Sequence, residues 1–297
     1  MYRSFDEISA KAKELGPLKM AILFPDEPDV MRSVRDGMKR GLVEPILVGD
    51  RGRIEAVAEE VGLPLKDTEL RHETDAQKAA NLCLDLVTSG PATFVMKGNV
   101  LTSYLYRALI RATKRLAPEQ TPCTLCFHQV DVLDKIFILT DPGVNIRPDL
   151  AVKQKMLANA LSVIRGLGCE RPKVMVMAAD RLDGALSPSA RHAKALRDAA
   201  LRGDLGESEI TVARNLAQAF PDHVLNRETF PDIMIVHNIE AGNVLVKCID
   251  HMGLGIRQGV TVGAGILVLT PSRSDGYESR MLNIALGVVL ADSGGGF

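Results

Sequence analysis

The segment Phe230-Pro-Asp-Ile-Met-Ile-Val-His-Asn-Ile-Glu-Ala-Gly-Asn243 places an apolar run directly before a polar turn. A second apolar run follows the glycine-rich span 253–265 and ends in Leu269-Thr-Pro-Ser-Arg-Ser-Asp275. Ligands of open α/β sheets bind in the crevice at the carboxyl ends of the strands. We therefore expect the polar residues after both runs to belong to a binding site.

Apolar runs alternate with helix-period segments on both sides of this region. The predicted strands are 19–24, 45–48, 92–96, 136–139, 173–178, 233–237 and 266–270. The predicted helices are 28–41, 51–61, 75–88, 101–112, 149–165, 188–202, 208–220 and 278–290. Such alternation is typical of α/β proteins with a largely parallel sheet.

Length and composition indicate an ordinary soluble protein of two domains. A chain of 297 residues exceeds what one core usually supports, and turn signals at 143–148 suggest a boundary. The net charge of -1 gives no basic field for nucleic acid, and no apolar run is long enough for a membrane span. The charged amino terminus lacks a signal peptide, and five cysteines favour reduced thiols in the cytoplasm.

Cys123 and Cys126 have a spacing that metal and redox sites also use. No second pair accompanies them, and they lie in the apolar run 121–130. Two buried thiols are therefore favoured over a zinc or redox site.

Lys97 and Gly98 follow one predicted strand and precede a helix that carries Thr102 and Arg107. A glycine lets backbone amides approach a ligand, a helix start favours an anion, and lysine adds a positive charge. The alternative is a plain strand–helix loop with a solvated lysine.

The turns 140–145 and 237–243 supply further polar groups. Asn145 lies in a turn that Asp141 could simply cap, so this turn has a structural explanation as well. Glu240, Gly242 and Asn243 join a strand to a helix, where Glu240 could either cap the helix or hold a ligand. His237 ends an apolar strand and is expected to be structural.

Ser272, Arg273 and Asp275 form the most informative cluster. Arginine offers a planar fork for phosphate oxygens, serine a hydroxyl, and aspartate a proton acceptor or a partner that orients the arginine. The structural alternative is a helix start capped by Ser274 or Asp275.

These residues resemble the phosphate acetyl/butyryltransferase family, and most closely its butyryltransferase branch. The resemblance rests on motifs in the family's order: Met96-Lys-Gly98, Asp141-Pro-Gly-Val-Asn145, Ile239-Glu-Ala-Gly-Asn243, the glycine-rich 259–265, Ser272-Arg-Ser-Asp275, Arg280 and Ile284-Ala-Leu286. It implies two α/β domains with a cleft, as in isocitrate/isopropylmalate dehydrogenases. We expect 1–146 with 267–297 to form one domain and 147–266 the other.

The resemblance also implies a reaction: acyl-CoA and phosphate exchange to acyl phosphate and CoA by direct attack in a ternary complex. Ser272, Arg273 and Asp275 would be catalytic, with Asp275 or Glu278 taking the thiol proton. Lys97, Gly98, Thr102, Arg107, Asn145, Glu240, Gly242 and Asn243 would bind substrate. A homodimer is implied, with no metal and no permanently bound cofactor; CoA or acyl-CoA enters as substrate.

The chain departs from the family pattern at three places. Ser279 stands where the acetyl branch has a carboxylate, His237 stands where proline is common, and 181–227 lacks the usual Gly-Pro-Leu-x-x-Asp segment. The last departure motivates an alternative, a weakened relative that binds CoA or acyl-CoA without turnover. A decarboxylating dehydrogenase is disfavoured because neither Mg²⁺-spaced aspartates nor a Gly-x-Gly-x-x-Gly turn is present.

Overall fold

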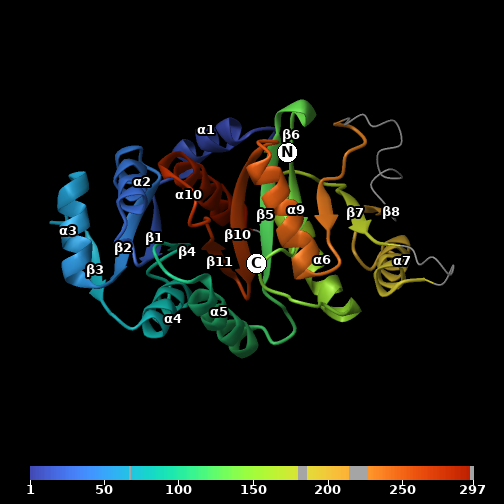
Figure 1. Cartoon of the computed structure of the whole chain (residues 1–297), viewed down its shortest axis with the longest axis horizontal. Coiled ribbons are helices and arrows are strands. Elements are labelled where there is room, and N and C mark those ends of the chain that lie inside the picture. Colours follow the sequence, from blue (N-terminus) through green and yellow to red (C-terminus); the bar gives the residue numbers. More distant parts are fainter. Residues whose placement is uncertain (67, 180–185, 214–226, 295–297) are drawn as a thin grey trace. The chain divides into compact units, whose positions relative to one another are not determined.

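A computed structural model describes residues 1–66, 68–179, 186–213 and 227–294. The chain has a mixed α/β fold, as predicted (Figure 1). Two compact units divide it: Met1–Ser4 with Cys123–Arg257, called unit 1, and Phe5–Pro122 with the chain from Gln258 on, called unit 2. The domain boundaries expected from the sequence, 1–146 with 267–297 and 147–266, stay a prediction.

Unit 2 contains the strands in the order β3, β2, β1, β4, β11, β10. Their bounds are β1 (Leu18–Leu23), β2 (Val43–Gly49), β3 (Glu69–His72), β4 (Phe94–Lys97), β10 (Ile256–Gly263) and β11 (Ile266–Leu269). The pairs from β3 to β11 are parallel, and β10 is antiparallel to β11.

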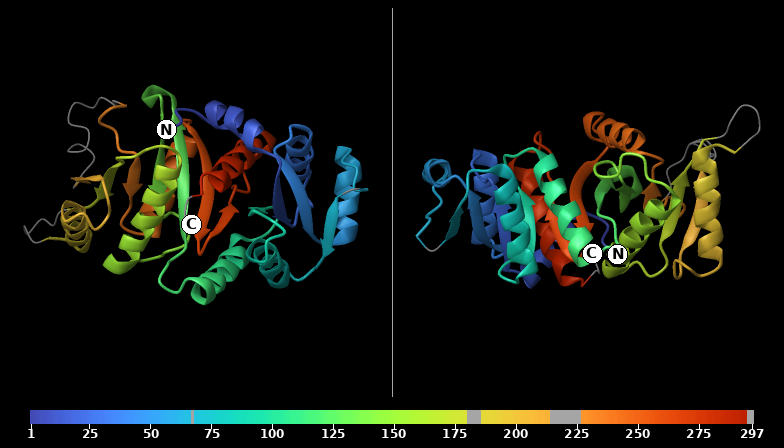
Figure 2. Two further views of the ribbon diagram at one scale, coloured as in Figure 1. Left: turned by 180° about the vertical axis from the view of Figure 1, so that it is seen from behind. Right: turned by 90° about the horizontal axis from the view of Figure 1, so that it is seen from below.

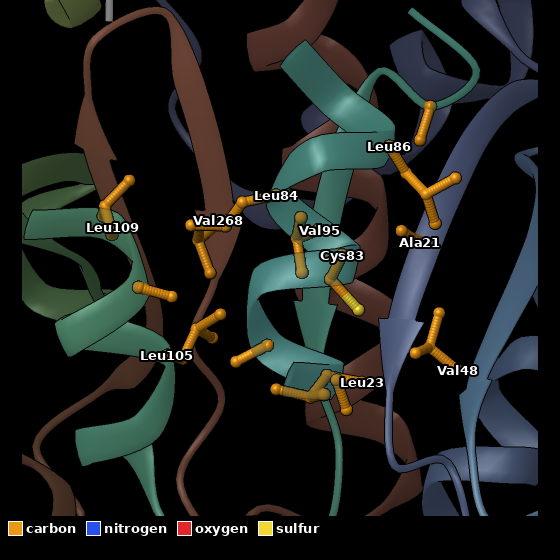
Figure 3. Packing of buried hydrophobic residues seen from close by; sticks show 14 of the residues in the cluster. Ala21, Leu23, Val48, Cys83, Leu84, Leu86, Val95, Leu105, Leu109 and Val268 are labelled. Carbon is orange, nitrogen blue, oxygen red and sulfur yellow. The ribbon is translucent and has the colours of Figure 1, made fainter. Parts of the chain in front are cut away.

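The helices of unit 2 are α1 (Phe5–Leu15), α2 (Pro28–Lys39), α3 (Arg51–Val61), α4 (Ala76–Thr88), α5 (Thr102–Leu116) and α10 (Tyr277–Asp292). Helices α4 and α5 pack side by side (Figure 2), and α10 packs against α1 and α2. Apolar side chains beneath α4 and α5, among them Leu23, Val95 and Val268, are almost fully buried (Figure 3). This packed layer fixes the ends of β1, β4 and β11.

Unit 1 contains the strands in the order β5, β6, β9, β7, β8. Their bounds are β5 (Cys123–Val130), β6 (Lys135–Thr140), β7 (Lys173–Met177), β8 (Glu209–Ala213) and β9 (Ile233–Ile235). The helices are α6 (Leu150–Gly166), α7 (Pro188–Leu201) and α9 (Ile239–His251), with a 3₁₀ turn at Asp131–Leu133. Strands β6, β9, β7 and β8 are mutually parallel, so their carboxyl ends meet at one edge.

One predicted element is wrong. The helix expected at 208–220 begins instead as strand β8, which pairs in parallel with β7; β-branched Ile210 and Thr211 suit a strand. Residues 214–220 lie outside the described residues. The glycine-rich span 253–265, for which no element was predicted, contains β10, joined to β11 by a tight turn in which Ala264 and Gly265 have positive φ.

Candidate functional site

The first polar cluster lies in unit 2, where two neighbouring parallel strands end. Val268 of β11 is opposite Val95 of β4, and Leu269 is opposite Met96. The register brings Lys97 and the chain after Leu269 to the same edge of the sheet. The ends of β4 and β11, whose residues were predicted to belong to one site, are therefore adjacent.

Gly98 holds the turn after β4 against the end of β1. Its amide donates to the carbonyl oxygen of Leu23 at 2.8 Å, and the Asn99 amide donates to that of Phe24 at 2.7 Å. A Cβ at position 98 would overlap the Phe24 carbonyl oxygen. Only glycine allows this approach, so its primary role here is to seat the turn.

Lys97 is 2% exposed, and its Nζ donates to the Gly98 carbonyl oxygen at 3.2 Å. Burial, and then the positive charges of Arg280 and Arg273, lower the pKa of Lys97 to about 8. The carboxylates of Asp275 and Glu27 oppose that shift. The solvated lysine of the alternative interpretation is therefore wrong, and Lys97 is electrostatically coupled to the Ser272–Asp275 turn.

The Ser272–Asp275 turn is closed by its own side chains. The Ser272 amide donates to Asp275 Oδ2 at 2.7 Å, and the Ser272 and Ser274 hydroxyl oxygens are 3.1 Å apart. Gly276, rather than Ser274 or Asp275, is the N-cap of α10, and no side chain caps that helix start. Arg273 is exposed at the tip of the turn.

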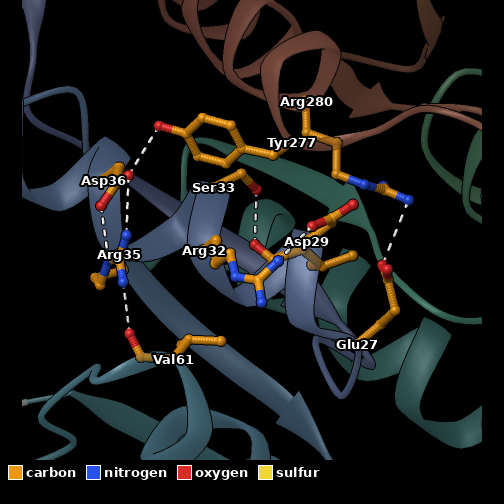
Figure 4. A network of polar contacts seen from close by, with 10 residues as sticks. Glu27, Asp29, Arg32, Ser33, Arg35, Asp36, Val61, Tyr277 and Arg280 are labelled. Carbon is orange, nitrogen blue, oxygen red and sulfur yellow. Dashed lines mark hydrogen bonds and ion pairs between the residues drawn. The ribbon is translucent and has the colours of Figure 1, made fainter.

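Arg280 is a buried cation that the sequence reading did not assign to the site. It is 3% exposed, and its Nη2 lies 3.5 Å from Glu27 Oε2 (Figure 4). Its Nε and Nη1 have no hydrogen-bond partner in the part of the chain described. An arginine among the apolar residues of the closing helix was the available signal.

Thr102 and Arg107 lie on α5. Thr102 is half-buried at the first position of the helix, whose N-cap, Leu101, makes no side-chain hydrogen bond. Arg107 is exposed, with its guanidinium 4.7 Å from the centre of the Tyr104 ring. Their roles in substrate binding remain predictions.

In unit 1, the carboxylate of Asp141 organises the turn after β6. Asp141 is 1% exposed and accepts from the amides of Thr124, Gly143, Val144 and Asn145 at 2.9–3.1 Å, and from Asn145 Nδ2 at 2.6 Å. Burial raises its pKa, and the amide donors oppose that shift. Asn145 is thus held by Asp141, and the structural interpretation of this turn accounts for both.

The turn before α9 places its predicted residues differently. Asn238 is the N-cap, and its side chain accepts from the Ala241 amide, so Glu240 does not cap the helix. Glu240 and Asn243 are exposed. Gly242 is buried, where a Cβ would lie 2.9 Å from Val236 Cγ2 and 3.0 Å from Pro142 Cα. This glycine therefore seats α9 on the Asp141 turn.

A cluster of Lys153, His192 and His237 was not predicted. Lys153 of α6 is 2% exposed, and its Nζ lies 2.9 Å from His237 Nδ1 and 3.2 Å from His192 Nδ1. Burial lowers the pKa of Lys153 to about 8 and also lowers the pKa of both histidines. His237 is hydrogen-bonded within the fold, as its structural interpretation requires.

The cysteine prediction is confirmed for Cys123 and Cys126, which are buried free thiols. Burial raises the pKa of each to about 12. Within the described residues, no group of three or more His, Cys, Asp or Glu side chains could hold a metal ion. Nor does any helix there have the length and apolarity to cross a membrane.

Comparison with known proteins supplies the family. The chain is 30% identical to the phosphate butyryltransferase of Clostridium acetobutylicum over 298 residues, covering 98% of this chain and 99% of that protein. The chain belongs to the phosphate acetyl/butyryltransferase family. The phosphate acetyltransferase of Rickettsia felis is 25% identical over 96% of this chain and 84% of its own length. No protein-family model matches the chain.

The fold agrees with membership of the phosphate acetyl/butyryltransferase family. A branched-chain phosphotransacylase from Enterococcus faecalis V583 superposes with a TM-score of 0.71 at 21% identity, covering 92% of this chain and 99% of that one. Of the family departures, the segment 181–227 is described only at 186–213 and at 227. Residues 181–185 and 214–226 of that segment therefore lie outside the described structure.

Proposed function

We propose that the protein exchanges a short-chain acyl group between CoA and inorganic phosphate. The observation that carries this proposal is the pairing of β4 with β11, which puts Lys97 and Gly98 beside the Ser272–Asp275 turn. A buried lysine, an exposed arginine and a serine hydroxyl suit a reaction between two anionic partners. Family membership supports the same chemistry.

In the proposed reaction, a phosphate oxygen attacks the thioester carbonyl carbon, a C–O bond forms and the C–S bond breaks. Arg273 stabilises the charge that develops on the carbonyl oxygen, and Ser272 donates to that oxygen. Asp275 relays the proton that the attacking phosphate loses to the departing CoA thiolate, and in the reverse direction it accepts the proton of the CoA thiol. Because phosphate attacks directly, positioning replaces a covalent enzyme intermediate.

Substrate contacts are proposed for the remaining predicted residues: Lys97, Gly98, Thr102, Arg107, Asn145, Glu240, Gly242 and Asn243. Lys97 and Gly98 have the best support, because a buried cation at a strand end attracts anions. Asn145 and Gly242 also have structural roles, Asn145 through its hydrogen bonds to Asp141 and Gly242 through its close packing. A contact with substrate would be additional to these roles.

We also propose that the two units are α/β domains of the isocitrate/isopropylmalate dehydrogenase type. The protein would act as a cytoplasmic homodimer without a permanently bound cofactor. The free thiols are compatible with a reducing compartment. Sedimentation equilibrium at micromolar concentration tests the dimer, and a monomer mass would contradict it.

The function is tested with the purified full-length chain, inorganic phosphate and acetyl-, propionyl- or butyryl-CoA. Release of free thiol that depends on phosphate is expected with at least one of the three. If none yields thiol while CoA still binds, the transferase proposal is wrong and the non-catalytic binding alternative is favoured.

A further inference from the structure

The guanidinium of Arg280 is only partly used within the fold. Among the described residues its ionic contact is to Glu27, at 3.5 Å, and its Nε and Nη1 are buried there without hydrogen-bond partners (Figure 4). Buried polar groups are almost always paired, because a buried donor without an acceptor destabilises the fold, and a charged one does so most. A buried arginine with two unused donor nitrogens is thus prepared for a partner.

Two partly buried cations of the chain show what a purely structural pairing looks like. Arg257 Nε lies 2.7 Å from Asp250 Oδ2, and Lys135 Nζ lies 2.7 Å from Asp232 Oδ1. Both pairs are direct and short. The looser contact between Arg280 and Glu27 therefore does not explain why a guanidinium is buried at this position.

Lys97 lies in the same electrostatic environment as Arg280. The positive charges of Arg280 and Arg273 and the negative charges of Asp275 and Glu27 act on it. Arg280 and Arg273 are the strongest of these charges, so Lys97 lies in a predominantly positive environment. Lys97 and Arg280 are 2% and 3% exposed.

Nearby polar atoms point to the same conclusion. Thr270, which follows β11 and precedes Ser272 by two residues, has a buried hydroxyl without a hydrogen-bond partner among the described residues. Arg280 lies in the first turns of α10, whose start no side chain caps. Hydroxyl, amide and guanidinium donors are what a tetrahedral oxyanion requires.

We infer that Lys97 and Arg280 form a phosphate-binding pair, with Arg280 a binding residue for the acyl-accepting inorganic phosphate. This inference rests on the proposed function for the identity of that phosphate. The exposed Arg273 then stabilises the thioester carbonyl oxygen, so the two arginines interact with different substrates. Bound phosphate places its negative charge beside the two buried cations, Lys97 and Arg280.

The test compares Arg280→Gln and Arg280→Lys with wild type in the phosphate-dependent thiol-release assay. Arg280→Gln removes the charge and is expected to raise KM for phosphate by ~10- to 100-fold, the size of one lost charge-assisted hydrogen bond. KM for acyl-CoA should stay within about twofold, since acyl-CoA contacts are unchanged. Arg280→Lys should recover part of the phosphate affinity.

The matched control is Arg32→Gln on α2. Arg32 pairs with Asp29 at 3.0 Å and is well exposed, and both KM values should match those of wild type. A rise in KM for acyl-CoA alone in Arg280→Gln would assign Arg280 to a phosphate group of CoA and overturn the inference. Unchanged KM values in both Arg280 variants would overturn it as well.

A binding measurement separates this inference from the proposed function. Inorganic phosphate should raise the melting temperature of the wild-type protein more than chloride at equal ionic strength, and Arg280→Lys should weaken this effect. If no acyl-CoA releases thiol but phosphate still stabilises through Arg280, the proposed function fails and the site stands. Absence of phosphate stabilisation in the wild type, which requires no variant to fold, contradicts the site.

Discussion

Asp141 shows how one side chain can set the geometry of a turn. Its two carboxylate oxygens accept five hydrogen bonds, four from backbone amides and one from the Asn145 side chain. The turn that Asp141 stabilises packs against Gly242 of α9. The residue predicted as an ordinary turn aspartate is thus the organiser of one strand end in unit 1.

Asp141→Asn is expected to lower the free energy of unfolding by about 3 kcal/mol, because charge-assisted bonds are lost and an amide group faces amide donors. Urea unfolding checks this. Asp149→Asn is the control: Asp149 caps α6, asparagine caps equally well, and the change should stay below about 1 kcal/mol. Equal losses in both variants would show that the Asp141 network is not special.

Arg273→Ala should lower turnover by at least ~10²-fold, the usual loss when a donor to a developing oxyanion is removed. Stability should change little because the side chain is exposed. Steady-state thiol release measures the effect, with Arg115→Ala on α5 as the control for loss of an exposed arginine. Turnover near wild type would remove Arg273 from the proposed mechanism.

At the scale of elements, α10 is joined to α2 by a polar network as well as by apolar packing (Figure 4). Tyr277 donates its hydroxyl to Asp36 Oδ2 at 2.8 Å. Arg35 is the main cause, and Tyr277 a further one, of the lowering of the pKa of Asp36 to about 2. This network fixes the start of the helix that carries Arg280.

Tyr277→Phe should therefore lower the free energy of unfolding by about 1 kcal/mol, the typical contribution of one hydrogen bond. A double-mutant cycle with Asp36→Asn isolates the pair, and a coupling energy of similar size is expected. Fully additive losses in urea unfolding would mean that the two side chains do not interact in solution.

Gly242 fixes how closely α9 approaches the turn after β6. Gly242→Ala should destabilise the protein by about 1–3 kcal/mol, because a methyl group would overlap Val236 and the Pro142 backbone. Gly52→Ala on α3 is the control, since its only neighbour within 4 Å is an Asp50 side-chain oxygen. There alanine should be neutral or stabilising, and a matching loss at both glycines would contradict the packing argument.

The periodicity of the sequence predicted most elements because apolar spacing is a local property. It failed at β8 and β10, where strands are recognised by their partners: β8 pairs with β7, and β10 pairs with β11 and ends in Gly263, where Pro122 leaves no space for a side chain. Helix α1 was not predicted because its segment is rich in charged residues and has only three buried positions, Phe5, Ile8 and Ala12.

The candidate site was predictable only in part. Lys97 and the Ser272–Asp275 turn could be found because turn chemistry and motif resemblance are readable along the chain. Arg280 was visible as an arginine in the apolar closing helix, but its burial and that of Lys153 could not be predicted, since a charged residue within a helix is ordinarily solvated. Their burial follows from the three-dimensional packing of α10 and α6, which no local pattern encodes.

At the scale of the whole molecule, Lys97 and Lys153 predict how stability depends on pH. The pKa of each is lowered from 10.5 to about 8 in the folded state. Between pH 8 and 10.5 the unfolded chain therefore binds more protons than the folded one, and these two groups make stability rise with pH. Below pH 8 their unfavourable contribution is present in full.

Lys153→Met should remove one of these two contributions. Urea unfolding at pH 8, 9 and 10 should give a shallower dependence than wild type, by at most ~1.4 kcal/mol per pH unit. Lys155→Met, two residues further along α6, serves as the control for loss of a lysine. If the free energies of unfolding of wild type and Lys153→Met changed equally with pH, the lowered pKa of Lys153 would be contradicted.

The contacts of Lys153 also determine the hydrogen positions on two imidazole rings. A protonated ammonium has only donors, so Nδ1 of His192 and Nδ1 of His237 must both accept from it. Because the pKa of each ring is lowered, both rings are neutral near pH 7 and carry their single hydrogen on Nε2. While Lys153 keeps its proton, each histidine offers its neighbours an N–H donor at Nε2 and no lone pair with which to remove a proton from a thiol.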